Sequence, residues 1–292
     1  MSEGFDDVST AERVTVLLDK VHEHYLVTLF SELNDLRLRA VLIKGWAATR
    51  NYPDDARRSP GDIDLLVEPS MAESEEILKI TANPKKFGAI DLHAGPRHLD
   101  TLRFEELFER SRTVDLEGVP IRILCPEDHL RVMCVHWLTD GGEKKERLWD
   151  IYWAVKNRPS SFNWEKCLGV VSGRRRRWIV CTVGLAHRHL GLEIDDLPFA
   201  EEAKALPAWF TRAVEVRWEK GVPHVPLSQS LDSIRQLSQQ LRKRLPPSPV
   251  MATIGMEGSF DAPTRAHYQI GYMFKQAVPS VKRMAAAIRR RS

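Results

Sequence analysis

Two aspartates separated by one residue, Asp62 and Asp64, stand in an apolar segment of the chain at residues 62–67. Side chains alternate along a strand, so a strand here would direct both carboxylates to one face and Ile63 and Leu65 to the other. Two carboxylates this close repel each other and raise each other's pKa unless a cation lies between them. A divalent metal ion is the simplest such cation, and hard oxygen ligands favour Mg²⁺.

A third aspartate follows in a segment with the same alternation, residues 87–93. Ile90 and Leu92 would share one face of a strand there, and Asp91 and His93 the other. Three carboxylates on neighbouring strands can hold two metal ions, orient a nucleoside triphosphate and neutralise charge on leaving pyrophosphate. We therefore expect Asp91 to hold the ion that activates an acceptor hydroxyl, or to act as the base for it. A D-x-D pair alone is more often a solvated strand edge, so this interpretation depends on the flanking segments.

The flanking segments supply groups suited to phosphate. An apolar run at residues 40–43 stops at Lys44 and Gly45. A Lys that closes a buried strand is unusual, and its ammonium would neutralise phosphate charge as a point cation. Arg58, in the loop before the carboxylates, would bind phosphate through two hydrogen bonds, with an ordinary surface base as the equal alternative. His93 would contact phosphate or orient the third carboxylate, and a structural histidine is the alternative.

The spacing of apolar residues predicts the elements that position these groups. Strands are predicted at 40–43, 62–67, 90–93, 113–117 and 119–124. Helices are predicted at 9–38, 71–81 (capped by Ser70), 104–110, 127–139, 143–157, 163–171, 175–190, 207–220, 227–244 and 266–289. This order predicts an α+β fold, in which a small mixed sheet flanked by helices is followed by a mostly helical C-terminal half. We expect two domains, an α/β core over 1–124 and a helical domain over 125–292 that completes the cleft.

The bulk composition limits the function classes. The 292 residues carry a formal net charge of +3, which is too small to indicate a nucleic-acid partner on its own. The basic runs at 174–177 and 289–291 are expected to be solvated helix ends, so nucleic acid stays an open acceptor without a specific signal. No apolar run reaches membrane-spanning length and the N-terminus is acidic, so we expect neither a signal peptide nor a membrane anchor. Four cysteines without metal-ligand spacing are typical of free thiols in the cytoplasm.

The arrangement resembles the nucleotidyltransferases of the DNA polymerase beta superfamily. Their pattern is a strand ending in a glycine turn, a strand bearing D-x-D and a later strand bearing a third acid. Within that superfamily the chain is similar to a branch of uncharacterised bacterial nucleotidyltransferase family proteins. The resemblance covers about residues 10–157, and the matching positions are 42–45, 52–53, 58, 61–67, 90–93, 126–130, 136, 147–148 and 150–151.

This resemblance implies a polymerase-beta-like fold and a catalytic set of Asp62, Asp64 and Asp91 holding two Mg²⁺ ions, with Mn²⁺ as the alternative ion. It also implies that Arg147 contacts the nucleotide, although Arg147 and Asp150 are three residues apart on a helix and can simply pair. For Asp150, as for His136, a structural role is the expected one.

One departure from the superfamily pattern is evident. Trp46 follows Gly45 at the position where the superfamily usually has a small residue, often serine, that touches the triphosphate. Lys44 and Arg58 are the candidate replacements for that contact.

The activity implied is transfer of a nucleoside monophosphate from a nucleoside triphosphate (NTP) to an acceptor, with release of pyrophosphate. The acceptor is a small molecule, a protein or an RNA. Two alternatives stay open: a catalytically inactive module that binds nucleotide or a partner, and a toxin-like transferase acting on transfer RNA.

Overall fold

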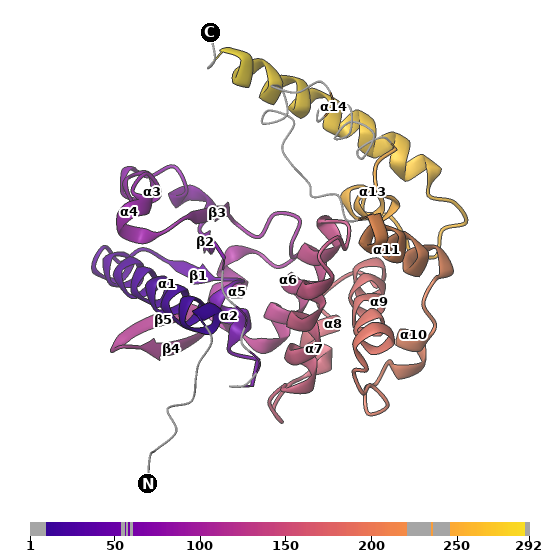
Figure 1. The fold of residues 1–292 in the computed structure, drawn as a ribbon, viewed down its shortest axis with the longest axis horizontal. Coiled ribbons are helices and arrows are strands. Elements are labelled where there is room, and N and C mark those ends of the chain that lie inside the picture. The colour runs from indigo at the N-terminus through magenta and orange to yellow at the C-terminus, as the bar shows by residue number, and fades with distance from the viewer. Residues whose placement is uncertain are drawn as a thin grey trace. The chain divides into compact units, whose positions relative to one another are not determined.

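The computed structural model describes residues 10–53, 56, 58, 61–220, 235 and 246–289. These residues form two compact units. The first lies within 1–133 and 153–170, and the second within 134–152 and 171–292. The first unit contains the whole β-sheet, and the second is helical (Figure 1). The predicted α+β class, with a small mixed sheet and a mostly helical C-terminal half, is confirmed, while the functional boundary at residue 124 stays a prediction.

The five predicted strands are all present and form one mixed sheet. Their bounds are β1 Ala40–Leu42, β2 Ile63–Val67, β3 Ile90–Ala94, β4 Arg112–Leu116 and β5 Val119–Ile123. The order across the sheet is β3-β2-β1-β5-β4, with β1 antiparallel to β2 and parallel to β5. β2 and β3 run parallel, and β4 and β5 run antiparallel. The carboxyl ends of β1 and β5 therefore lie at the same end of the sheet as the amino ends of β2, β3 and β4.

The helices of the first unit lie mainly before residue 133. They are α1 Thr10–Asp35, α2 Trp46–Thr49, α3 Glu75–Thr81, α4 Pro84–Phe87, α5 Phe104–Arg110 and α8 Trp164–Leu168, with a 3₁₀ helix at Pro69–Met71. The helix α6 Pro126–Thr139 begins directly after β5, and α7 spans Leu148–Lys156. Those of the second unit are α9 Gly173–Leu190, α10 Ala200–Lys204, α11 Ala208–Lys220, α13 Pro249–Gly255 and α14 Ala266–Arg289, with a 3₁₀ helix at Lys145–Arg147.

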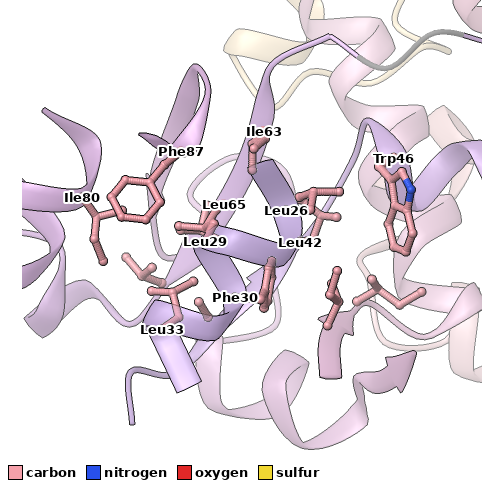
Figure 2. Close-up of a cluster of buried hydrophobic side chains, with 14 of the residues drawn as sticks. Leu26, Leu29, Phe30, Leu33, Leu42, Trp46, Ile63, Leu65, Ile80 and Phe87 are labelled. Carbon is pink, nitrogen blue, oxygen red and sulfur yellow. The ribbon is translucent and has the colours of Figure 1, made fainter. Parts of the chain in front are cut away.

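Two cores cover the two faces of the sheet. On one face, Leu26, Leu29 and Phe30 of α1 pack against Leu42 and Leu65, as Figure 2 shows. These residues recur on α1 at three- and four-residue steps, so one stripe of the helix is buried. We call this cluster the α1-side core. The opposite face is covered by α5 and α6, whose apolar residues pack against the other face of β1 and β2.

One predicted helix start was wrong because the capping residue was misplaced. Ser70 does not begin a helix: Pro69–Met71 is 3₁₀, and α3 begins after Ser74, whose Oγ accepts from the Ile77 N–H at 3.3 Å. The short helix α4, which was not among the predicted helices, forms because the Asn83 side chain caps it. The helices α10 and α13 were not predicted, and the helix predicted at 227–244 lies outside the described residues apart from residue 235.

Three of the four arginines in the basic run 174–177 pair with carboxylates of the second unit, so the expectation of a solvated run was wrong for these three, whereas Arg174 is exposed. Arg175 is 5% exposed and pairs with Glu257 at 2.5 Å. Arg176 and Arg177 both pair with Glu202. The run at 289–291 lies outside the described side chains. Among the described helices, none has the length and apolar character needed to cross a lipid bilayer.

Candidate functional site

The parallel pairing of β2 and β3 brings two of the three predicted acids together. Asp64 lies opposite Asp91 across the ladder, and Leu66 lies opposite His93. Residues opposite each other in a sheet project to the same face, and so do residues two apart on one strand. Because Leu65 belongs to the α1-side core, Asp64, Asp91 and His93 lie on the α5/α6 face of the sheet.

Asp64, Asp91 and His93 form a compact donor group. One ligand atom from each of the three lies within 4.8 Å of the others. His93 Nε2 is 3.4 Å from Asp64 Oδ1 and 3.2 Å from Asp91 Oδ2, so the imidazole bridges the two carboxylates. The Asp64 side chain is only 8% exposed, whereas that of Asp91 is 54% exposed. The group is therefore anchored in the sheet on one side and open to solvent on the other.

Lys44 is the charge partner of the buried aspartate. Its Nζ lies 2.7 Å from Asp64 Oδ1, and the two side chains are 10% and 8% exposed. The position follows from the antiparallel β1–β2 pairing, in which the Ile43 N–H donates to the Asp64 carbonyl oxygen at 3.1 Å. The ammonium thus offsets the cost of burying the carboxylate. A contact between Lys44 and phosphate, as predicted from the sequence, stays a prediction.

Gly45 and Trp46 build the turn that follows Lys44. Gly45 has φ 59° and ψ −118°, a conformation that favours glycine, and an added Cβ would meet the Asp62 carbonyl oxygen at 3.2 Å. Trp46 opens α2, is 5% exposed and belongs to the α1-side core (Figure 2). The large residue after the glycine is therefore a core residue, which explains physically why the usual small residue is absent.

The family assignment agrees with this geometry. Residues 6–191, more than half of the chain, match a family described as "uncharacterised nucleotidyltransferase". The chain belongs to this family. A search of curated proteins and a search of solved structures each found no match. The predicted membership of an uncharacterised nucleotidyltransferase branch is thus confirmed, and the donor group on β2 and β3 lies within the matched segment.

Asp62 stands apart from the donor group. It lies one residue before β2, is exposed, and is not a member of the group that the described residues form. Its role as a metal ligand stays a prediction. A neighbour that the sequence did not indicate is His22 on α1. Burial lowers the pKa of His22, and the negative charges of Glu23 and Asp62 partly offset this shift.

The two predicted arginines have different surroundings. Arg58 Nη1 donates to the Gly45 carbonyl oxygen at 3.2 Å, so the guanidinium is attached to the glycine turn. Arg147 belongs to the second unit, where its Nη1 lies 3.9 Å from Asp150 Oδ2. The plain pairing of Arg147 with Asp150 is confirmed, and the contacts of both arginines with nucleotide stay predictions.

Replacing Gly45 with Ala is expected to destabilise the protein by roughly 1–3 kcal/mol, the usual cost of forcing a residue into a sparsely populated backbone conformation. The reason is the positive φ together with the close approach of Asp62. Urea unfolding measures the change, with Gly61→Ala as the matched control, because an added Cβ there meets no atom within 4 Å. An equal free energy of unfolding for the two variants would contradict the expectation.

Proposed function

We propose that the protein transfers a nucleoside monophosphate from an NTP to a hydroxyl-bearing acceptor, in a reaction that depends on a divalent metal ion. The observation that carries the proposal is the convergence of Asp64, Asp91 and His93 within 4.8 Å at the end of the sheet of a nucleotidyltransferase. Phosphoryl and nucleotidyl transfer depend mainly on positioning and on charge stabilisation. A partly exposed group of anionic donors fits that requirement.

The donor set fits a divalent ion. Two carboxylates supply hard oxygen ligands, which suit Mg²⁺ and Mn²⁺, and the imidazole nitrogen adds a ligand that transition ions accept more readily. When bound, such an ion polarises a phosphoryl oxygen and lowers the pKa of an attacking hydroxyl. Asp62, two residues before Asp64, is our candidate ligand for a second ion.

The residues of the chain divide the remaining tasks. The acceptor oxygen forms a bond to the α-phosphorus of the NTP while the bond from that phosphorus to the bridging oxygen breaks, and pyrophosphate leaves with the electron pair. Asp91, the more exposed of the paired carboxylates, takes the proton of the acceptor hydroxyl. Without an ion, the Nε2 of His93 bridges the two carboxylates, and Lys44 holds Asp64 in both states. Arg58 and Arg147 are our candidates for contacts with the nucleotide.

A binding module without turnover is the second candidate. Two observations favour it: the ammonium of Lys44 already neutralises Asp64, and Trp46 lies in the core where a phosphate-contacting residue is usual. A toxin-like transferase acting on transfer RNA draws little support from the basic run 174–177, since three of its four arginines pair with carboxylates of the second unit.

The test is incubation of the full chain with each α-labelled NTP and Mg²⁺ or Mn²⁺, with and without cell extract. We expect pyrophosphate release and transfer of label to an acceptor, both abolished by EDTA and by the double substitution Asp62→Ala/Asp64→Ala. Equal signals from the double variant and the unaltered protein would exclude this site as the centre of the reaction. Tight NTP binding without pyrophosphate release under any condition would support the binding module instead.

A further inference from the structure

A second set of charged residues gathers at the same end of the sheet, on the side away from β3. Arg112 opens β4 and lies opposite Ile123, which in turn lies beside Leu42 of β1. Since β1 and β5 separate β4 from β2, the backbones of β2 and β4 are about 14 Å apart at a strand spacing of about 4.8 Å. Arg112 therefore belongs to a different part of the sheet end from the Asp64 group.

Two further arginines come from the chain that links β1 to β2. Arg58 is attached to the Gly45 turn through the carbonyl oxygen of that glycine. Arg50 follows the last residue of α2, and its guanidinium lies over the Trp46 ring at 5.0 Å from the ring centre. Because Trp46 is fixed in the core, the ring holds Arg50 beside the same turn.

His129 supplies a buried polar group among these arginines. It lies in the first turn of α6, where its N–H donates to the Cys125 carbonyl oxygen at 2.9 Å, and the residue is 4% exposed. Its Nε2 has no hydrogen-bond partner among the described residues. Burial, followed by the positive charges of Arg112 and Arg58, lowers the pKa of His129 to about 3, so the ring is neutral at physiological pH. A buried polar nitrogen without a partner is rare in folded proteins.

Among the described residues, the positive charges of Arg50 and Arg112 are only partly compensated. Burial and the positive charge of Arg50 lower the pKa of Arg112, and Cys125 and Glu127 oppose that shift. The carboxylate of Glu127 accepts from the Asn163 N–H at 3.0 Å. The next acid along the chain, Asp128, is engaged by Arg110 and Arg131, each at 2.7–2.8 Å. In the part of the chain that the structure describes, no carboxylate pairs with Arg50 or Arg112.

We propose that Arg50, Arg58 and Arg112, gathered around the buried imidazole of His129, form a binding site for a phosphate group, separate from the Asp64 group. Guanidinium groups bind phosphate oxygens through paired charged hydrogen bonds. The Nε2 of His129, when it carries the proton of the neutral ring, donates one more. A bound phosphate would relieve the mutual repulsion of the arginines and give Nε2 its missing partner.

Two sources can supply the phosphate, and only this part of the inference rests on the proposed function. One is the triphosphate of the NTP, reaching past the Gly45 turn from the Asp64 group. The other is a phosphate on the acceptor. Both present the same chemistry to the arginines, so binding experiments with separate ligands distinguish them.

The test is calorimetric titration of inorganic pyrophosphate into the full chain in EDTA, without divalent metal. We expect binding by the unaltered protein and a roughly 10- to 100-fold weaker Kd for Arg112→Gln or Arg50→Gln, the effect of losing one charged hydrogen bond. The matched control is Arg97→Gln, because Arg97 is exposed and lies beyond the carboxyl end of β3, at the opposite end of the sheet. Thermal unfolding verifies that the variants are folded.

The outcomes separate the site from the proposed reaction. Equal pyrophosphate affinity in Arg112→Gln, Arg50→Gln and the control, or no binding by the unaltered protein at millimolar pyrophosphate, would overturn the site. Repeating the titration with NTPs assigns the source: weaker NTP binding in Arg112→Gln indicates the triphosphate, and unchanged NTP binding indicates a phosphorylated acceptor. The site and the proposed function can also fail separately. If the unaltered protein shows no transfer activity but pyrophosphate still binds, and binds equally well to Asp64→Asn, the phosphate site stands and the proposed function fails.

Discussion

Replacing Asp91 with Asn is expected to lower the rate of nucleotidyl transfer by roughly 10²- to 10³-fold, the usual effect of removing one group that stabilises charge at a reacting centre. Thermal stability should stay almost unchanged. The Asp91 side chain is 54% exposed, and within the site it contacts His93 Nε2 at 3.2 Å. The side-chain oxygen of Asn can still accept a hydrogen bond from that nitrogen. The substitution therefore removes a negative charge and a proton acceptor without opening a cavity.

The comparison needs three variants measured by the same assay. Glu76→Gln on α3 is the control for loss of an exposed carboxylate, and it should be as active as the unaltered protein. Asp62→Asn tests whether the exposed carboxylate before β2 takes part, since a loss as large as that of Asp91→Asn would assign it to the centre. Full activity of Asp91→Asn would show that the third acid lies elsewhere in the chain.

The sequence sufficed for the strands and for the shared face of Asp91 and His93, because both follow from period-two alternation. Asp91 and His93 alternate with apolar residues, and this pattern predicted that both lie on one face of β3. What the pattern could not supply was the register. Only the parallel pairing of Asp64 with Asp91 shows that His93 bridges the two carboxylates and completes a donor group.

The roles of Lys44 and Trp46 could not be predicted from the sequence, because both depend on the direction in which the side chain points. A Lys that closes a strand can face a ligand or a buried acid, and only the antiparallel neighbour decides between them. Trp46 appeared as a misfit in a phosphate-binding turn, because the direction of a side chain after a glycine with positive φ cannot be read from residue types. The start of α3 was misplaced because two serines, Ser70 and Ser74, were both suitable caps, and residue types alone do not decide which of them caps the helix.

Lys44→Met is expected to destabilise the protein by about 3–5 kcal/mol, the usual cost of leaving one member of a buried ion pair without its partner. The remaining carboxylate of Asp64, 8% exposed, would be without the ammonium that lies 2.7 Å away in the unaltered protein. The double variant Lys44→Met/Asp64→Asn should recover most of that loss, because neither charge is then buried. Urea unfolding of the unaltered protein, the two single variants and the double variant forms a thermodynamic cycle that isolates the coupling of the pair.

The same cycle separates the two candidate functions. If the donor group binds a metal ion, Mg²⁺ or Mn²⁺ replaces the missing ammonium as the counter-charge of Asp64, so millimolar metal should stabilise Lys44→Met more than it stabilises the unaltered protein. A metal effect that is equal in the two proteins, or that persists in the double variant, would contradict metal binding at Asp64. If metal stabilises Lys44→Met but the unaltered protein does not turn over NTP, the result supports a binding module that holds an ion. The ligands would then be intact while the transfer reaction is absent.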